Sequence, residues 1–299
     1  MGRLVIAPGV RQAIAAGSPV VALESAVITH GLPKAAAMDA VRRQWEACEK
    51  AGATPAVIAV FWGALRVGLT VDECGALAER PDAVKVSPWN LASALTGPGF
   101  GGTTVAATVA AAALAGIRIV STGGIGGVHP GGDGQDVSAD LTELSRRAVC
   151  VVCAGPKSTL DPGATLERLE TLGVPVIAWR SSLLAGFLAR SAGLRLPVRA
   201  DDVDELASLL AAHWELGGAG AIVSQPLPGD LAIPLAELAV DDAGTRGPER
   251  TPAELRRLQA RLGDRVIQAN VAVLERNAAL AGSLAAALAG QLAAPSAHG

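Results

Sequence analysis

The chain has 299 residues, of which 50% are hydrophobic and 18% are charged, and its formal net charge at pH 7 is −3. This length allows a substantial buried core, and without any basic stripe the chain lacks the electrostatic footprint of a nucleic-acid-binding protein. Apolar runs are broken well before the roughly 18 residues of a membrane span and no secretory signal pattern is present, so we expect a cytoplasmic protein without membrane association.

Strand-like and helix-like stretches alternate along the chain. Short apolar, β-branched runs predict strands, and apolar side chains spaced by three or four residues predict helices. Asp140, followed three residues later by Glu143, resembles a capping pair that opens the helix 139–147. The predicted strands are 19–25, 56–62, 83–87, 116–120, 148–154, 174–179 and 220–225, and the predicted helices are 34–51, 70–80, 102–115, 139–147, 162–172, 201–215, 231–243, 251–262 and 266–288.

This alternation predicts an α/β fold, an α/β/α layered sandwich with a mostly parallel sheet. The stretch 244–250 reads as a polar loop, and no linker is long enough to divide the chain. We therefore expect a single domain over residues 1–290, followed by a disordered tail over residues 291–299.

The four cysteines do not resemble the disulfide framework of a secreted protein. Cys150 and Cys153 have CxxC spacing but fall within a predicted strand, where residues three apart point to opposite faces. We expect them to be buried small apolar side chains rather than a redox or zinc pair.

Several polar residues are predicted to meet beyond the carboxyl ends of the strands. Glu24 ends the first strand, Lys85 lies within an outer one, a glycine loop at Gly123 follows 116–120, and Lys157 closely follows 148–154. Ligands of open α/β sheets bind at this edge. We expect an acid, two lysines and a flexible loop to share one cleft.

Lys157 has the surroundings of a reactive amine. It stands just beyond a continuous apolar run, where partial desolvation can lower the pKa of a lysine from about 10.4 and free its lone pair to form an imine. The chain has four lysines against 21 arginines, and arginine cannot lose its proton. A solvated cation or a phosphate clamp remains the alternative interpretation.

The glycine-rich loop STGGIGGVH (121–129) matches no dinucleotide fingerprint, because His129 stands where the last glycine is required and no helix follows directly. Its glycines would let backbone N–H groups approach a phosphate. A simple tight turn is the other interpretation.

Several long segments carry a family pattern in order along nearly the whole chain: ALESAVITHGLP (22–33), GATPAVIAV (52–60), GGTTVAATVAAAALAGI (101–117), STGGIGGVH (121–129), DVSADLTEL (136–144), VVCAGPKSTLD (151–161), TLERLETLGVPV (165–176) and ANVAVLERNAAL (269–280). They closely resemble the pseudouridine-5′-phosphate glycosidases, including the indigoidine-cluster A proteins. The resemblance implies an α/β/α fold, a homotrimer, a divalent metal that is usually manganese, and reversible cleavage of a C-glycosidic bond into uracil and ribose 5-phosphate. Relatives run the reaction forward in natural-product pathways.

The resemblance also implies roles for individual residues. Lys157 matches the imine-forming lysine of the family, Glu24 its proton donor, and Asp136 its metal-binding aspartate. Asn277 lies about two helical turns beyond the matched asparagine and is an alternative base-reading residue. The remaining matches are Lys85, Val105, Ser138, Ala139 and Asp140 for the sugar phosphate, and Asn270 for the base.

These residue types suit the chemistry. A C–C glycosidic bond cannot be released by protonating a leaving oxygen, so the usual pair of carboxylates does not serve. If the ribose ring opens and Lys157 holds C1′ as an imine, the bond to uracil C5 can break by a retro-Mannich step, with Glu24 handling the proton at the base carbon. Asp136 offers hard oxygen ligation that suits manganese or magnesium.

The chain also departs from the family pattern. Pro88, Trp89 and Asn90 stand where most members read Arg-Arg-Asp, and Pro130 stands where they read arginine. An aromatic Pro-Ala-Phe-Tyr-like stretch is replaced by LAGFL (184–188), and the chain has no tyrosine. Each cation lost near a phosphate or an acidic loop removes a contact worth roughly 1.5 to 3 kcal/mol.

These departures leave three alternatives beside the glycosidase. The chain is a C-ribosyl synthase that joins ribose 5-phosphate to a different aglycone, another lysine-imine lyase such as an aldolase, or a non-catalytic phosphate-binding relative. His30 and His129 are read either as packing and turn residues or as parts of the site.

Overall fold

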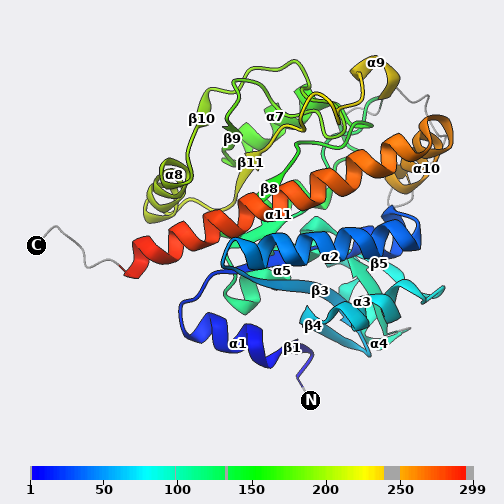
Figure 1. Cartoon of the computed structure of the whole chain (residues 1–299), viewed down its shortest axis with the longest axis vertical. Coiled ribbons are helices and arrows are strands. Elements are labelled where there is room, and N and C mark those ends of the chain that lie inside the picture. The colour runs from blue at the N-terminus through cyan, green and yellow to red at the C-terminus, as the bar shows by residue number, and fades with distance from the viewer. Residues whose placement is uncertain (1, 98, 132–133, 239–249, 294–299) are drawn as a thin grey trace, which may run out of the picture.

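The computed structural model describes residues 2–97, 99–131, 134–238 and 250–293, and one sheet runs through the whole fold (Figure 1). Its strands are β1 Leu4–Ile6, β2 Val20–Leu23, β3 Thr54–Phe61, β4 Ala64–Leu69, β5 Val84–Val86, β6 Phe100–Thr103, β7 Ile119–Ser121, β8 Cys150–Cys153, β9 Val176–Trp179, β10 Val198–Ala200 and β11 Ala221–Ser224.

The strand order is β1-β4-β3-β2-β7-β8-β11-β9-β10, with β6 paired to β3 and β5 paired to β6. Neighbours are parallel except where β3 meets β4 and β6. β3 pairs with β2 through its first half and with β6 through its last three residues. This branch brings the edge strand β5 close to the carboxyl end of β2.

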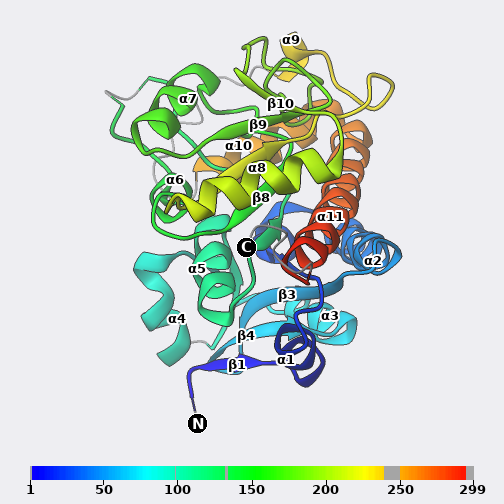
Figure 2. The same ribbon diagram turned by 90° about the vertical axis from the view of Figure 1, so that its left-hand side faces the viewer.

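Helices cover both faces of the sheet, which confirms the predicted sandwich. One hydrophobic core packs α2, α3, α8 and α11 on one face, and a second packs α1, α5, α6 and α7 on the other; Figure 2 shows α2 and α11 on the side opposite α4 and α5. The helices are α1 Pro8–Ala15, α2 Lys34–Lys50, α3 Val71–Ala78, α4 Leu91–Thr96, α5 Val105–Ala115, α6 Ala139–Leu144, α7 Pro162–Thr171, α8 Val203–Glu215, α9 Leu235–Leu238, α10 Arg250–Leu262 and α11 Asp264–Ala293, with a π-helix η1 at Val27–Gly31 and a 3₁₀-helix η2 at Pro88–Asn90.

The two cysteines of the CxxC spacing lie on opposite faces of β8, as predicted. Cys150 belongs to the core under α11, and Cys153 belongs to the core under α5. Burial raises the pKa of both thiols, that of Cys153 to about 12. A buried, protonated thiol is a packing group and not a nucleophile.

Helix α11 is long and apolar enough to cross a membrane by length and composition alone, over Asp264–Gln291. It lies instead across the fold, where it contacts α2, α8 and the strands β2, β7 and β8 (Figure 1). Of the most apolar 18-residue stretch of this helix, 56% is buried inside the protein. These contacts make α11 the central helix of one core layer.

The short elements were not predicted. β1, α1, β4, α4, β10 and the antiparallel pairing of β6 with β3 are absent from the predicted set, and residues 102–103 belong to β6 rather than to the predicted helix 102–115. The three-residue strands β1 and β10, and β6 with the sequence FGGT, carry too little periodicity to stand out.

Two predicted segments reach the limits of the described residues. Of the predicted helix 231–243 the structure has α9, and residues 239–249, which include nearly all of the predicted polar loop, lie outside the described residues. α11 continues to Ala293, so the predicted disorder is wrong for residues 291–293, while 294–299 also lie outside.

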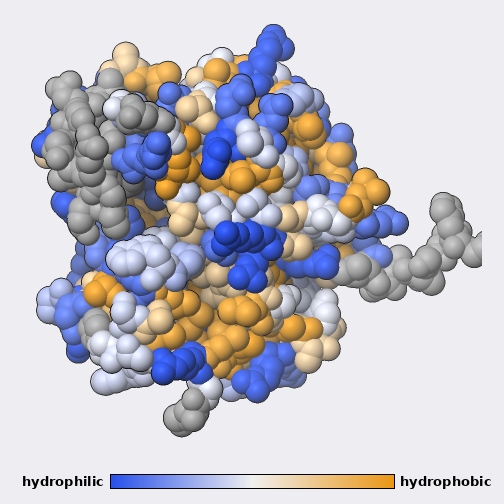
Figure 3. All heavy atoms as spheres, turned by 180° about the vertical axis from the view of Figure 1, so that it is seen from behind, coloured by the Kyte–Doolittle hydropathy of each residue, from blue (hydrophilic) through white to orange (hydrophobic). Residues whose placement is uncertain are grey.

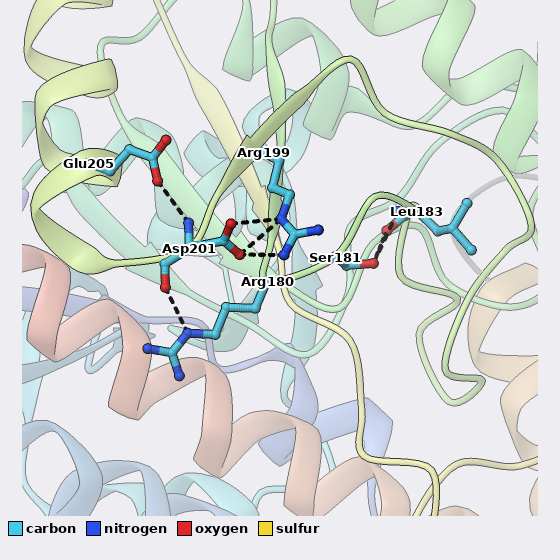
Figure 4. Close-up of polar contacts among 6 residues, drawn as sticks. All are labelled: Arg180, Ser181, Leu183, Arg199, Asp201 and Glu205. Atoms are coloured by element: carbon cyan, nitrogen blue, oxygen red, sulfur yellow. Dashed lines mark hydrogen bonds and ion pairs between the residues drawn. The ribbon is translucent and has the colours of Figure 1, made fainter.

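Polar contacts fix both ends of the segment that connects β9 to β10 (Figure 4). The Arg199 guanidinium donates to the Asp201 carboxylate over 2.7 to 2.9 Å, and Arg180 donates to the Asp201 carbonyl over 2.9 Å. The Asp201 N–H donates to Glu205 at the start of α8 over 2.9 Å. The segment held in this way includes Phe187, which reaches the site described next.

Candidate active site

Two adjoining cavities lie beyond the carboxyl ends of β2, β7 and β8. The larger has a volume of about 260 Å³ and the smaller about 60 Å³. Glu24, Ala26, Lys85 and Lys157 line both cavities and therefore form the wall where they meet. This is the cleft that the strand ends predicted.

The structure brings all the predicted site residues together. Their positions support the predicted roles but do not test them. Glu24, Lys85, Val105, Asp136, Ser138, Ala139, Asp140 and Lys157 line the larger cavity, and Asn270 lines the smaller one.

Glu24 directly follows β2, just before the π-helix η1. π-helical turns are rare and often occur at functional sites. The Val27 N–H donates to Oε2 of Glu24 over 3.3 Å, and the Thr122 hydroxyl donates to Oε1 over 3.5 Å. Burial raises the pKa of the Glu24 carboxyl, and the opposing charge of Lys157 only partly offsets this effect. Glu24 is therefore suited to carry a proton.

Lys157 follows β8 through a sharp turn at Gly155, whose φ is +85°. A Cβ at Gly155 would collide with the carbonyl oxygen of Ala185, so only glycine fits there. The Lys157 N–H donates to the Ile125 carbonyl over 3.0 Å, which joins the lysine to the glycine loop. Among the described residues, its half-buried ammonium has no carboxylate within ion-pair distance.

The glycines of the loop 121–129 are required by close packing. A Cβ on Gly126 would collide with Ser138, one on Gly127 with Thr165, and one on Gly124 with the ring of Phe187. Close packing against neighbouring side chains, rather than the geometry of a tight turn, therefore accounts for these three positions. Gly126 nevertheless forms part of the wall of the larger cavity.

Asp140 does not cap its own helix, so the predicted capping pair with Glu143 is wrong. The N-cap of α6 is Ser138, whose hydroxyl accepts the Asp140 N–H over 3.2 Å. The Asp140 carboxylate instead accepts from the Ala106 N–H over 2.8 Å and from the Gly126 N–H over 2.7 Å. Glu143 pairs with arginines of the same segment. The capping pattern concealed a tertiary contact.

The N-terminus of α5 faces the larger cavity. Thr104 caps it by accepting the Ala107 N–H over 3.3 Å, and Asp140 accepts the Ala106 N–H. No hydrogen bond joins the Val105 N–H to any part of the chain that the structure describes, and Val105 lines the cavity. A helix N-terminus with an available N–H is an anion-binding group.

The smaller cavity is mostly apolar. Val27, Phe187 and Leu274 line it, with Asn270 and His30 as its polar side chains beyond the shared wall. Asn277 has another function: its amide nitrogen donates to the carbonyls at 122 and 123 over 2.8 and 3.3 Å, and its side chain is 1% exposed. Asn270 is therefore the asparagine that faces this cavity.

A metal fits this site only with water or substrate as additional ligands. The described residues contain no group of three or more His, Cys, Asp or Glu side chains arranged to hold an ion. Asp136 lines the larger cavity together with His129, and the His129 N–H donates to the Asp136 carbonyl over 3.0 Å. One carboxylate with water and a phosphate is a normal environment for magnesium or manganese.

Two of the departures from the family pattern line the cavities: Trp89 lines the larger one, and Phe187 of the stretch 184–188 lines the smaller one. Pro88–Asn90 form η2, in which the Asn90 side chain accepts the Ser87 N–H over 2.7 Å and donates to the Lys85 carbonyl over 3.0 Å. This turn holds Trp89 at the cavity, where its side chain is 74% exposed.

The cavity residues without a predicted role include Trp89, Thr104 and Phe187. Thr104 has a readable signal, since a threonine before a small-residue helix is a common N-cap. Phe187 has φ of +63°, a strained conformation for an aromatic residue that is not visible in the sequence.

Comparisons with known proteins identify the family of this chain. Residues 9–287 match the family described as indigoidine synthase A like protein. Pseudouridine-5′-phosphate glycosidases of Nocardioides sp. and Solibacter usitatus are each 44% identical, over 96% and 94% of this chain and 97% and 98% of theirs.

Two solved structures are also similar. The prealnumycin C-glycosynthase AlnA in complex with ribulose 5-phosphate has a TM-score of 0.89 at 34% identity and covers 98% of this chain and 99% of its own. An indigoidine synthase A-like protein from Thermotoga maritima has a TM-score of 0.88 at 34% identity and covers 96% of both chains. Pseudouridine-5′-phosphate glycosidases are thus relatives of this chain, and the chain belongs to the indigoidine synthase A-like family.

Proposed function

We propose that this protein reversibly breaks and forms the C–C bond between ribose 5-phosphate and uracil, as a pseudouridine-5′-phosphate glycosidase. One observation carries the proposal: Glu24 and Lys157 stand at the wall shared by a larger cavity, rich in charged and hydroxyl side chains, and a smaller cavity that has fewer of them. A sugar phosphate in the first cavity and a base in the second would place the bond between them beside an amine and an acid. The names of the relatives at 44% identity point to the same substrate.

In the cleavage direction, Nζ of Lys157 bonds to C1′ as the C1′–O4′ bond opens, and a proton passes from this nitrogen to O4′, which becomes a hydroxyl. Glu24 delivers its proton to C5 of the base, and the C1′–C5 bond breaks as the nitrogen lone pair forms the C1′=N imine. Water then hydrolyses the imine, which frees Lys157 and releases ribose 5-phosphate. The raised pKa of Glu24 suits this role, because the group must hold a proton before the bond breaks.

The larger cavity offers donors for the sugar phosphate. The Val105 N–H lies at the positive end of α5, Ser138 begins α6, and Lys85 adds a charge from β5. A divalent cation at Asp136, manganese by family resemblance, would offset negative charge in this cavity. Calorimetric titration of manganese into the wild type and the Asp136→Asn variant tests that assignment.

The side chains of the smaller cavity suit a planar base. Val27, Phe187 and Leu274 offer apolar surface for its faces, and Asn270 supplies an amide to read its edge. A C-ribosyl synthase with another aglycone is the second candidate. It is supported by the similarity to a prealnumycin C-glycosynthase and by Trp89 at the larger cavity, where the family has arginine.

We also propose that the protein is a cytoplasmic homotrimer, as the family resemblance implies. Figure 3 shows apolar side chains over much of the lower half of the face on which Figure 2 places α4 and α5. Leu114 of α5 is 61% exposed. Large exposed apolar areas commonly mark protein interfaces. Light scattering coupled to size-exclusion chromatography measures the oligomeric state directly.

The decisive experiment supplies manganese, ribose 5-phosphate and uracil and measures pseudouridine 5′-phosphate by mass spectrometry. Borohydride should trap a ribose 5-phosphate adduct on Lys157. An adduct with cleavage of a different carbon bond would indicate an aldolase. No adduct and no turnover, with ribose 5-phosphate still bound, would indicate a phosphate-binding relative. An adduct without a product from uracil would favour the different aglycone.

A further inference from the structure

We propose that Asp140 is a positioning residue: its carboxylate clamps the first turn of α5 to the glycine loop, so that both present their groups to the substrate. The inference deepens the proposed function and rests on it for its kinetic part. The two oxygens of Asp140 accept the Ala106 and Gly126 N–H groups over 2.8 and 2.7 Å. The Ala106 donor belongs to α5 and the Gly126 donor belongs to the glycine loop, so Asp140 links two segments whose donors are twenty residues apart in the chain.

Burying the Asp140 carboxylate costs free energy of folding unless hydrogen bonds compensate for its lost hydration. The Asp140 side chain is 5% exposed, and among the described residues no lysine or arginine pairs with it. A buried charge of this kind is tolerated when it is fully hydrogen-bonded. Two backbone N–H groups and the positive end of α5 supply that compensation.

The clamp leaves one donor for the ligand. The N-terminal turn of α5 has its Ala107 N–H held by Thr104 and its Ala106 N–H held by Asp140. The Val105 N–H is the donor that remains directed at the larger cavity. Asp140 thus acts on the sugar phosphate through the backbone that it orients.

Close packing shows that the loop and the clamp are built together. A Cβ at Gly126 would collide with Oγ of Ser138 and would lie 2.9 Å from Oδ2 of Asp140. The Gly126 N–H can reach the carboxylate only because no side chain intervenes. The same loop carries Ile125, whose carbonyl accepts the Lys157 N–H, so the clamp also bears on the position of the amine.

The charge of Asp140 also reaches Glu24. Burial raises the pKa of Glu24, Asp140 adds to that increase, and Lys157 lowers it. The other titratable groups that border the two cavities are Lys85 from β5, His30 from η1, and Asp136 and His129 from the loop before α6. Removing the charge of Asp140 therefore lowers the pKa of Glu24.

Asp140→Asn tests the clamp, because an amide of the same shape offers one acceptor oxygen to two N–H donors. The matched control is Glu143→Gln, which neutralises a similarly buried acid of the same helix that lines neither cavity. Without substrate, amide hydrogen exchange at Ala106 and Gly126 should accelerate at least about 10-fold in Asp140→Asn and stay unchanged in the control. Unchanged exchange overturns the proposal.

The kinetic readout separates positioning from direct ligation. Asp140→Asn should lower kcat/KM for pseudouridine 5′-phosphate by about 10- to 100-fold and move the alkaline limb of the pH profile to lower pH. Weaker ribose 5-phosphate binding with unchanged exchange would make Asp140 a direct ligand and overturn the clamp. If Asp140→Asn does not fold, Asp140→Glu carries the exchange and kcat/KM readouts. If the wild type shows neither turnover nor adduct, the proposed function fails, while hydrogen exchange still decides the clamp.

Discussion

Two cavities of similar volume lie at opposite ends of the same strands. The larger active-site cavity, about 260 Å³, lies beyond the carboxyl ends of β2 and β7, and another of about 240 Å³ lies at their amino ends. Mostly aliphatic side chains line the second cavity, such as Ile14, Ile119 and Leu288. Of its lining residues that the structure describes, Arg118 alone carries a charge, whereas the first cavity gathers two lysines and three acids.

Strand direction explains the difference. At the carboxyl ends the chain leaves β2, β7 and β8 through loops that carry Glu24, Asp136 and Lys157, and α5 presents its N-terminus. At the amino ends the chain returns from helices, and α5 ends at Gly116 in the left-handed conformation. A parallel sheet therefore collects reactive groups and anion-binding helix ends on one side. Concavity alone does not make a site.

Of the substitutions that test the difference between the two cavities, Lys157→Ala should have the largest effect on activity. Loss of the amine removes the covalent intermediate, so kcat/KM for pseudouridine 5′-phosphate should fall by at least about 10⁴-fold. Lys157→Arg should be equally inactive, because arginine keeps the charge but cannot act as a nucleophile. Substantial activity in the arginine variant would mean that position 157 supplies charge and not an amine.

Glu24→Gln should lower kcat/KM by about 10²- to 10⁴-fold, because the amide cannot supply a proton. The same substitution should raise the stability of the folded protein above that of the wild type at high pH. The raised pKa means that the folded state holds this proton more tightly than the unfolded chain, so stability is lost as pH rises from near the ordinary value of 4.5 through the folded-state pKa.

The glutamine variant cannot ionise and avoids that loss. Melting curves at several pH values should show Glu24→Gln more stable than the wild type above the raised pKa, and the two should converge below pH 4.5. Parallel stability profiles would show that the pKa of Glu24 is the same in the folded and unfolded states, which contradicts a raised pKa and its role as the acid.

The sequence predicted the residues at the carboxyl ends of the strands better than it predicted the pairing of the strands. Glu24 and Lys157 were found because each follows a strongly apolar strand, and parallel strands bring their carboxyl ends to one edge. The pairing of β6 with β3, which brings Lys85 to the same edge, was not predicted. It joins residues far apart in the chain, such as Phe61 and Phe100, whose rings are in contact, and a sequence pattern does not encode pairing partners.

Local patterns were misleading where tertiary contacts prevailed. Asp140 with Glu143 has the spacing of a capping pair, yet Ser138 caps the helix and Asp140 reaches α5. Asn270 and Asn277 are equivalent by spacing, and only the packing of α11 over the loop distinguishes the one that faces the cavity. Residues with two hydrogen-bonding options are the ones that sequence patterns leave undecided.

Trp89 offers a smaller, optical contrast between the two cavities. Its side chain borders the active-site cavity, while Trp214 borders the other. Ribose 5-phosphate should change the emission of Trp89, and Trp89→Phe should abolish this change and alter KM by about 3- to 10-fold. Trp214→Phe should leave the response intact. A response that survives Trp89→Phe would place the ligand away from η2.

Arg118→Ala should have the smallest effect, and it tests whether the second cavity is only structural. The Arg118 guanidinium lies 4.9 Å from the ring centre of Trp214, and the indole N–H of Trp214 donates to the Ala219 carbonyl over 2.9 Å. Loss of the cation–π contact should lower the free energy of unfolding by about 0.5 to 1 kcal/mol. Both kcat and KM should stay unchanged, because no charged group of this cavity takes part in the reaction. A change in kcat without a change in melting temperature would show that the second cavity influences the reaction at the other end of β2 and β7. Strand direction alone would then no longer explain why one end of the sheet is reactive.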